Sequence, residues 1–352
     1  MSHQRSSPVK YRLLGRTGVW VSELSLGTMT FGGADHPVYR VIGALGQAEV
    51  DRVVGTALDA GINFIDTADA YADGESEQLL GQAIGKRRRD VVLATKLMAP
   101  VGPGPNDQGL SRLHVARALE DSLRRLGTDY IDLYQIHNYD RVTPIEETLS
   151  ALDDAVRQGK VRYIGASNLA AWQMSKALGI SARHNQVGFV ANQVHYSLVS
   201  RDAERDLVPM AEDAGLSLTV WSPLAGGFLS GKFDRGVTDE NTRRARVGGD
   251  FVQFDLDKGY RIVDVLRTVA ARHEVSPARV AIAWLLAQRA VTSVIIGARK
   301  LDQLADNIAA VDLALTEQDL AELDAVSAPP VAYPNWIQEG FAPSRIPAGS
   351  VV

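Results

Sequence analysis

Short apolar runs alternate with longer amphipathic stretches along most of the chain. The first four apolar runs span residues 24–26, 62–65, 91–95 and 131–136, and polar residues follow each of them. Short apolar runs bounded by turn residues are typical of buried strands, whereas apolar residues three and four positions apart are typical of one face of a helix. The pattern therefore predicts strands and helices in regular alternation.

The alternation continues far along the chain. Further apolar runs at residues 161–165, 191–195, 216–221 and 291–296 bring the predicted strands of this series to eight. Strands that alternate with helices form parallel sheets, and eight such units favour a closed (β/α)8 barrel, the TIM barrel. An open doubly wound sheet is the alternative, but the turn at residues 27–32 lacks its glycine fingerprint.

Helix-end signals agree with this interpretation. Ser111 is expected to cap one helix, and Gly127 is expected to end it. Thr143 is expected to cap the next helix, with Pro144 in its first turn and Glu146 completing a capping box. Other helices are predicted at residues 48–60, 75–84, 301–310 and 316–326, and one is expected to begin at Ser276-Pro277.

The remaining segments lie before, within and after this series. Residues 11–21 are expected to form a β-hairpin that turns at residues 15–18 and closes the bottom of the barrel. An insertion of about residues 226–258 has weak periodicity, which is typical of a functional or mobile loop. We expect one domain, with the barrel at about residues 22–326 and an aperiodic tail at residues 327–352.

Three successive predicted strands end on an ionisable residue. Asp66, Lys96 and His137 occupy these ends, and Tyr71 follows Asp66 in the next loop. Each has a structural explanation when taken alone, although a lysine directly after a buried strand needs a partner. Because active sites of such barrels lie at the carboxyl ends of the strands, we expect the four side chains to converge.

This combination of groups fits a proton donor. A free phenol loses its proton only near pH ~10, but a neighbouring ammonium stabilises the phenolate and lowers that pKa. In the predicted chain, Asp66 holds Lys96, Lys96 acts on Tyr71, and His137 orients a carbonyl oxygen. The set would protonate the alkoxide that forms when a hydride reaches a carbonyl carbon.

Composition limits the remaining classes of function. The chain has 352 residues and no cysteine, which excludes disulfides and thiolate chemistry and indicates a reducing cytoplasm. The net charge of −5 gives no reason to expect nucleic acid. No apolar stretch is long enough for a membrane span, and residues 1–10 lack the apolar core of a signal peptide. The seven histidines show no paired spacing, so no metal site is predicted.

These motifs resemble those of a known family, the aldo-keto reductases, over most of the chain from residue 27 to residue 307. The family motif matches residues 66–71, its lysine matches Lys96, and its histidine matches His137. The similarity looks greatest to the branch that includes the potassium-channel β-subunits and bacterial sugar or glycerol aldehyde reductases. Because the channel subunits differ at the histidine, His137 favours a working reductase over a sensor.

The resemblance also implies a site for NADP(H) without a Rossmann unit. It assigns the nicotinamide amide to Ser167, Asn168 and Gln193, and the face of the nicotinamide ring to Trp221. Residues 222–232 would wrap the pyrophosphate. The full implied cofactor site consists of Gly27, Thr28, Met29, Asp66, Ser167, Asn168, Gln193, Trp221, Ser222, Pro223, Leu224, Gly226, Lys232, Arg244, Gly297, Arg299, Gln303, Asp306 and Asn307.

The adenosine end of that site differs from the family pattern. Asp306 replaces the usual glutamate, and Arg299 stands where many relatives carry serine. A guanidinium can pair with a 2′-phosphate, and Lys232, Arg243 and Arg244 are further candidates. NADP(H) is therefore favoured over NAD(H).

Residues 226–232 also come close to a phosphate-binding P-loop. Phe233, however, stands where that motif requires a magnesium-binding serine or threonine. This excludes an NTPase, but the backbone amides of the loop and Lys232 remain candidates for holding phosphate.

The sequence therefore predicts an NADP(H)-dependent reductase of a small or sugar-like aldehyde or ketone, working as a monomer or homo-oligomer. One alternative is a lyase or aldolase that forms a Schiff base on Lys96. Another is a non-catalytic nucleotide-binding subunit that senses redox state. The predicted substrate contacts are Met29, Tyr39, Tyr71, His137, Asn138, Trp172 and Tyr196, together with the tail near Trp336.

Overall fold

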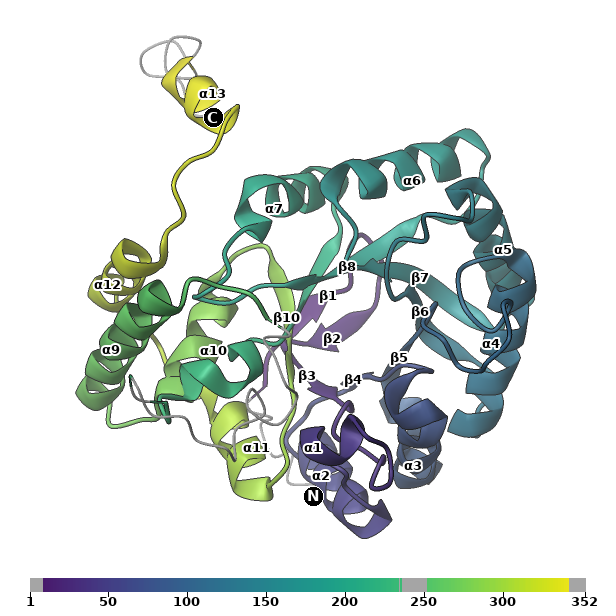
Figure 1. Ribbon diagram of the computed structural model, residues 1–352, viewed down its shortest axis with the longest axis horizontal. Coiled ribbons are helices and arrows are strands. Elements are labelled where there is room, and N and C mark those ends of the chain that lie inside the picture. The colour runs from purple at the N-terminus through teal and green to yellow at the C-terminus, as the bar shows by residue number, and fades with distance from the viewer. Residues whose placement is uncertain (1–8, 234, 236–251, 342–352) are drawn as a thin grey trace, which may run out of the picture.

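The computed structural model in Figure 1 describes residues 9–233, 235 and 252–341. A closed barrel is formed by eight strands in the order β10-β3-β4-β5-β6-β7-β8-β9, and all neighbouring strands pair in parallel. The predicted (β/α)8 barrel is confirmed. The barrel strands are β3 (Leu24–Gly27), β4 (Phe64–Asp66), β5 (Val92–Leu97), β6 (Ile131–Ile136), β7 (Val161–Ser167), β8 (Phe189–His195), β9 (Ser217–Trp221) and β10 (Val291–Ile296).

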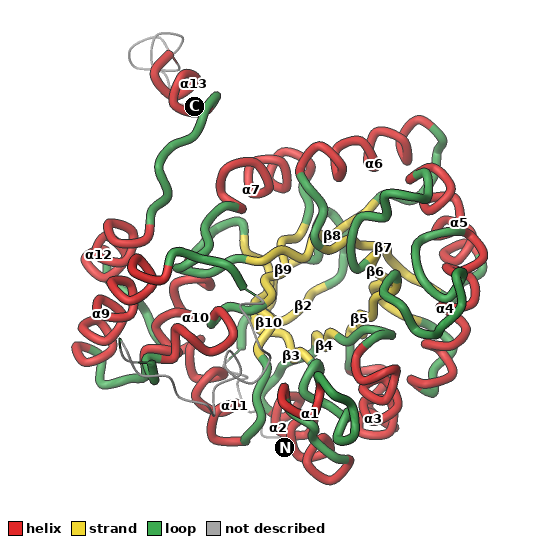
Figure 2. Tube along the Cα trace, in the orientation of Figure 1, coloured by secondary structure: helices red, strands yellow, loops and turns green. Residues whose placement is uncertain are grey.

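Helices surround the barrel, as Figure 2 shows. They bury their apolar faces against the outer faces of the strands, which is why the strands are apolar on both sides. No helix in the described part of the chain is long and apolar enough to cross a membrane. The helices are α1 (Tyr39–Ile42), α2 (Gln47–Asp59), α3 (Glu75–Ile84), α4 (Arg112–Leu126), α5 (Ile145–Arg157), α6 (Ala171–Arg183), α7 (Ala203–Ala214), α9 (Leu256–Arg272), α10 (Pro277–Ala287), α11 (Leu301–Ile308), α12 (Glu317–Ser327) and α13 (Asn335–Phe341).

A hairpin closes one end of the barrel, as predicted. Strands β1 (Tyr11–Leu13) and β2 (Trp20–Ser22) pair in antiparallel fashion. Gly15 has φ +58°, and a Cβ there would lie 2.5 Å from the Val190 carbonyl oxygen, so the turn fits against the barrel only as glycine. Apolar side chains of the hairpin and of the barrel interior form one buried cluster, made of Leu14, Val21, Phe64, Ala94, Leu133 and Ala191.

The predicted start of helix α5 is wrong. The helix begins at Ile145 with Pro144 in the N-cap position, and Thr143 does not cap it. Instead, the Thr143 hydroxyl donates to Asp140 Oδ2 over 2.7 Å. The Asp140 carboxylate also accepts from the backbone N–H groups of Val142 and Leu110, so this loop uses the hydroxyl that would otherwise cap the helix.

The predicted insertion and tail are partly helical. Helix α9 begins at Leu256, inside the expected insertion, and Asp255 caps it by accepting from Lys258 N. The tail carries α13, which projects away from the barrel in Figure 1. Arg205 of α7 contacts the start of this segment, because its side chain donates to the Tyr333 carbonyl and its own carbonyl accepts from Asn335.

Candidate active site

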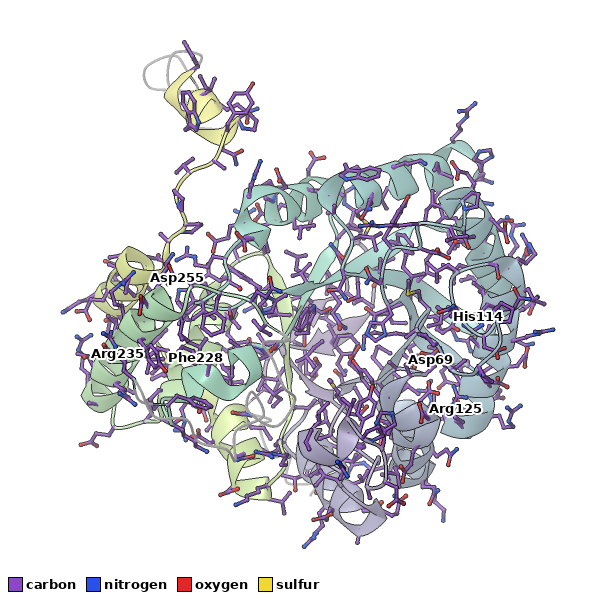
Figure 3. All side chains as sticks on the ribbon, in the orientation of Figure 1. Asp69, His114, Arg125, Phe228, Arg235 and Asp255 are labelled. Carbon is purple, nitrogen blue, oxygen red and sulfur yellow. The ribbon has the colours of Figure 1, made fainter. Side chains whose placement is uncertain are left out.

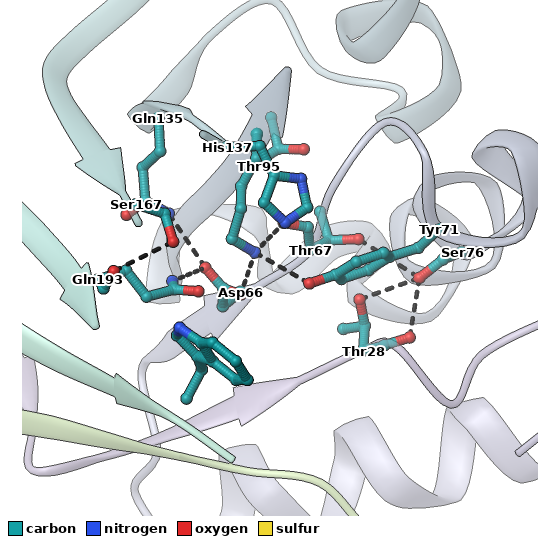
Figure 4. A network of polar contacts seen from close by, with 12 residues as sticks. Thr28, Asp66, Thr67, Tyr71, Ser76, Thr95, Gln135, His137, Ser167 and Gln193 are labelled. Atoms are coloured by element: carbon teal, nitrogen blue, oxygen red, sulfur yellow. Dashed lines mark hydrogen bonds and ion pairs between the residues drawn. The ribbon is translucent and has the colours of Figure 1, made fainter. Parts of the chain in front are cut away.

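Lys96 lies at the centre of a polar network inside the barrel, at the carboxyl end of β5. Its side chain is fully buried, and its ammonium donates to Asp66 Oδ1 at 2.5 Å, to the Thr67 carbonyl at 2.8 Å and to Tyr71 Oη at 3.3 Å. An ammonium has three N–H donors, so all three are used. Figure 4 shows Asp66, Thr67 and Tyr71 around this group.

Asp66 is held from both sides. Its second oxygen, Oδ2, accepts from Gln193 Nε2 at 2.9 Å and from Gln135 Nε2 at 3.1 Å. Gln135 was not among the predicted residues, although a signal for it exists. It lies two positions before His137, which directly follows the same strand, and alternate residues of a strand point to the same face. The two amides and Lys96 fix the carboxylate in one orientation.

The charge of Lys96 follows from these contacts. Burial lowers the pKa of Lys96, but the Asp66 carboxylate and Tyr71 outweigh it, so the pKa lies above its ordinary value. The side chain is therefore a charged ammonium at neutral pH, and a neighbouring ammonium favours the phenolate over the phenol.

Tyr71 reaches Lys96 from the short 3-10 turn Tyr71–Gly74. Its ring lies 5.0 Å from Lys96 Nζ and 5.9 Å from the His137 ring. Ala72 and Asp73 adopt positive φ angles of 50° and 53°, so the backbone turns sharply after the tyrosine. This turn keeps a half-buried tyrosine beside the buried ammonium.

His137 is a neutral imidazole. Burial and then the Lys96 charge lower its pKa to about 3. Its Nδ1 atom has no hydrogen-bond partner in the described part of the chain. A neutral imidazole carries one N–H, so this ring can donate to a carbonyl oxygen beside Tyr71 without adding a charge.

Residues from β7, β8 and β9 form a second group next to Asp66. Asn168, at φ +59°, donates through Nδ2 to the His137 carbonyl at 3.0 Å and accepts from Trp221 Nε1 at 3.1 Å. Ser167 Oγ and Asn168 N both donate to the Gln193 carbonyl. The structure thus brings Ser167, Asn168, Gln193 and Trp221 together at the same end of the barrel as Lys96.

Strand β3 and the loop after β9 border this group. Thr28 N donates to the Asp66 carbonyl, but the Thr28 side chain is buried against Ser76, 2.9 Å away. After β9, the chain turns through positive φ angles at Ser222, Gly226 and Gly227. A Cβ on either glycine would meet nothing within 4 Å, so the loop is open there. Lys232 is exposed, and Arg243 and Arg244 lie outside the described residues.

The predicted adenosine end contains an ion pair that the sequence did not indicate. Asp306 accepts from Arg279 Nη2 at 2.8 Å and from Ser276 Oγ at 2.5 Å. Gln303 Oε1 accepts from the backbone N–H of Arg299 at 3.3 Å. Gly297 and Arg299 are exposed, while Asn307 is buried. Arg279 thus lies among the predicted cofactor residues.

The predicted substrate residues are not all in one place. Tyr39 donates to the Ala70 carbonyl at 3.0 Å, its ring lies 6.4 Å from the Tyr71 ring, and burial raises its pKa to about 12. Trp172 is 62% exposed and lies 6.1 Å from the Tyr139 ring. Asn138 is exposed, and Met29, in the loop after β3, is half-buried.

Two of these predictions need correction. Tyr196 is 2% exposed and donates its hydroxyl to Glu204 at 2.6 Å, so it packs in the core beside Trp284 and has no hydroxyl to offer a substrate. Trp336 lies on α13, which projects away from the barrel in Figure 1, and packs against Tyr333 of the same tail. The tail near Trp336 therefore does not line the site.

Comparison with known proteins agrees with this geometry. The family model described as Aldo/keto reductase family matches residues 23–328. An uncharacterized oxidoreductase of Bacillus subtilis, YrpG, is 40% identical over 90% of this chain and 96% of its own length. A probable voltage-gated potassium channel subunit beta of Oryza sativa is 38% identical, with the same coverage. Versiconal hemiacetal acetate reductase of Aspergillus parasiticus is 34% identical over 93% of this chain and 99% of its own length. With this coverage and these identities, the chain belongs to the aldo/keto reductase family.

Proposed function

We propose that this protein is an NADP(H)-dependent oxidoreductase that reduces an aldehyde or a ketone to an alcohol, with Tyr71 as the proton donor. The observation that carries the proposal is the buried Lys96 ammonium, bonded at once to Asp66 and to the Tyr71 hydroxyl. An acid of this kind needs a cation that stabilises its anion, and Lys96 has no other acidic partner among its three contacts.

Each side chain has a separate part in the reaction. NADPH, when bound, supplies the hydride. Tyr71 gives its hydroxyl proton to the oxygen of the substrate as that oxygen gains charge, and Lys96 stabilises the phenolate that remains. Asp66 keeps the ammonium charged and in place. The neutral His137 donates a hydrogen bond to the same oxygen and orients the carbonyl.

The residues around the catalytic group fit the cofactor. Asn168 is fixed by three contacts, and Trp221 is held between Asn168 and the His195 ring, 4.6 Å away. These groups support a nicotinamide site next to Asp66. The open positive-φ turn at residues 226–227 supports phosphate binding by backbone N–H groups.

The choice of NADP(H) over NAD(H) rests on the basic residues of the adenosine end. We propose that Arg299 pairs with the 2′-phosphate, with Lys232 and Arg244 as further candidates, and that Gln303, Asp306 and Asn307 hold the adenosine. The Arg279–Asp306 ion pair, 2.8 Å long, places one more guanidinium beside these residues.

We propose that the substrate lies over Tyr71 and His137 and contacts Met29, Tyr39, Asn138 and Trp172. This mixture of polar and aromatic side chains suits a small or sugar-like aldehyde or ketone. A reducing cytoplasm is the expected location, because the chain contains no cysteine.

The direct test measures the loss of reduced-nicotinamide absorbance. Purified protein is mixed with NADPH or NADH and with short aldehydes, ketoses and aromatic aldehydes. We expect a decrease that needs both the protein and a carbonyl, and that is faster with NADPH. Tyr71→Phe is the matched control, because it removes one hydroxyl and keeps the ring. Wild-type turnover in that variant would disprove the assignment of the proton donor.

A second candidate function is a nucleotide-binding subunit that senses redox state without turnover. It is favoured by the relatives named as potassium channel subunits beta, at 38% and 37% identity. Tight NADPH binding with turnover no faster than that of Tyr71→Phe would support this candidate. A Schiff-base enzyme is disfavoured, because the charged Lys96 ammonium has no free electron pair for attack on a carbonyl.

A further inference from the structure

A second buried polar cluster lies on the outer side of the barrel wall, directly behind Lys96. It consists of Asp69, Glu77, Thr95, Arg125 and Tyr134 (the outer cluster). Thr95 and Tyr134 are paired neighbours on β5 and β6, while Glu77 and Arg125 come from α3 and α4. Asp69 and Arg125 are labelled in Figure 3. None of these residues takes part in the reaction proposed above.

Glu77 is fully paired within the outer cluster. Its side chain has no exposed surface, and it accepts from Arg125 Nε at 2.7 Å and from Thr95 Oγ1 at 2.6 Å. Arg125 crosses Gly74 so closely that a Cβ there would lie 2.7 Å from Arg125 Cδ. The guanidinium is thereby fixed on Glu77.

Asp69 has no such partner. It is 1% exposed, and no side chain in the described part of the chain donates a hydrogen bond to either of its carboxyl oxygens. The Tyr134 hydroxyl is equally buried and unpartnered within the same described residues. The outer cluster holds two carboxyl groups and one guanidinium, so one carboxyl group lacks a counter-ion. A buried carboxylate without a counter-ion costs several kcal/mol, and such groups take up a proton instead.

Asp69 is also connected to the candidate active site. Its backbone N–H donates to the Lys96 carbonyl at 3.0 Å, and it stands two positions before Tyr71. Charged or titratable groups face it from each neighbouring element: Glu77 from α3, Arg125 from α4, Lys96 from β5, Tyr134 from β6 and Tyr39 from α1.

We propose that Asp69 holds a proton in the folded protein, and that losing this proton weakens the acid formed by Tyr71 and Lys96. Asp69 is a positioning residue in this proposal, since it acts through Lys96 and touches neither substrate nor cofactor. The effect on the reaction rests on the proposed function, whereas the proton itself does not.

The electrostatic balance agrees with this assignment. Burial and then the Glu77 carboxylate raise the pKa of Asp69 to about 8, against the opposing effects of Arg125, the Ala70 N–H and Lys96. Above that pH, a negative charge appears behind Lys96 and offsets part of the ammonium field that acts on Tyr71. A phenol with less support from a cation is a weaker acid, and a weaker acid transfers its proton more slowly.

Whether Asp69 holds a proton is tested by measuring the stability of the folded protein, without any assay of activity. Unfolding by urea is compared for the wild type and Asp69→Asn from pH 4.5 to 9.5. The unfolded carboxyl group loses its proton near pH ~4, while the folded one keeps it. The folding equilibrium constant of Asp69→Asn should therefore rise relative to the wild type by up to about tenfold per pH unit, and level off near pH 8.

Two further variants sharpen this measurement. Glu77→Gln removes the neighbouring negative charge and leaves the Arg125 guanidinium without its own counter-ion, so the ratio should level off at a lower pH in that background. Asp73→Asn is the matched control, because Asp73 is an exposed carboxyl group of the same loop. A ratio of Asp69→Asn to wild type that does not change between pH 4.5 and 9.5 would overturn the proposal.

The effect on the reaction is tested by the pH profile of carbonyl reduction. The ratio of kcat at pH 9.5 to kcat at pH 6.5 should be several-fold lower in the wild type than in Asp69→Asn. Equal ratios in two active proteins would overturn the link to Lys96. If neither protein reduces any carbonyl, the proposed function has failed, and the folding ratio still decides whether Asp69 holds the proton.

Discussion

Replacing Asp66 by asparagine would leave the Lys96 ammonium buried without its counter-ion. The lysine side chain has no exposed surface, so water cannot replace the lost charge. Breaking a buried ion pair from one side costs about 3–5 kcal/mol of unfolding free energy. The Thr67 carbonyl and the Tyr71 hydroxyl still accept from Lys96 in the variant, and the asparagine oxygen retains part of the third contact. We therefore expect a loss near the lower limit, about 3 kcal/mol.

Urea unfolding of four proteins tests this value: the wild type, Asp66→Asn, Lys96→Met and the double variant. Lys96→Met leaves the carboxylate with the two glutamine amides only, so it should also be costly. The double variant buries no net charge, and it should lose at least about 2 kcal/mol less than the sum of the single variants. Additive losses, or a cost of Asp66→Asn below about 1 kcal/mol, would refute a buried charged pair.

The pH dependence has a definite sign. Because the pKa of Lys96 is raised in the fold, the stabilisation by its charged form is complete below the ordinary lysine pKa, near ~10.4. It is lost as the pH rises through the folded pKa. The stability difference between the wild type and the double variant, which carries neither charge, should therefore be constant between pH 6 and 9 and decrease only at strongly alkaline pH. A difference that disappears between pH 6 and 8 would contradict the raised pKa of the paired lysine.

Three other substitutions test separate parts of the site. Tyr71→Phe should lower kcat by about 10²–10⁴-fold while the Kd of NADPH, followed by tryptophan fluorescence, stays within about twofold; a parallel loss of binding would contradict a purely chemical role. Arg299→Ala should weaken NADPH more than NADH in the same titration, and equal losses would exclude contact with a 2′-phosphate. His137→Gln should reduce the loss of stability that occurs between about pH 6.5 and 3, because an unfolded histidine takes up a proton near ~6.5 and the folded ring only at about 3. Urea unfolding at pH 7 and pH 5 measures this loss in the wild type and in the variant. An equal decrease in both proteins would show that His137 is charged in the fold.

The barrel could be predicted because its signal is repeated. Each strand is a short apolar run that ends on polar residues, and this periodicity survives local exceptions. Parallel strands place their carboxyl ends on one face, so Asp66, Lys96 and His137 could be expected near one another before any contact was known. The contact between Lys96 and Tyr71 could not be derived in this way, because Tyr71 lies in a loop that turns sharply at Ala72 and Asp73 through positive φ angles.

The residues that were missed or wrongly assigned have partners that the sequence pattern does not reveal. Gln135 acquires its role from Asp66, and Tyr196 is drawn into the core by Glu204 and Trp284. Alternation along a strand gives the face of a residue but not the partner that it meets there. The failure at Thr143 has the same cause, because Asp140 competes locally for its hydroxyl.

The polar network around Lys96 and the outer cluster together contain more acidic than basic side chains. On the inner side, Asp66 balances Lys96, and on the outer side Glu77 balances Arg125. Asp69 is the additional acid, and the wall is neutral only while it keeps its proton. Arg125→Met would remove the cation of the outer cluster and leave two buried carboxyl groups facing each other behind Lys96. We expect this change to cost about 3–5 kcal/mol, and Glu77→Gln in the same background should recover a large part of that loss. If Arg125→Met costs less than about 1 kcal/mol, the outer cluster is hydrated, and the charge count that assigns a proton to Asp69 no longer holds.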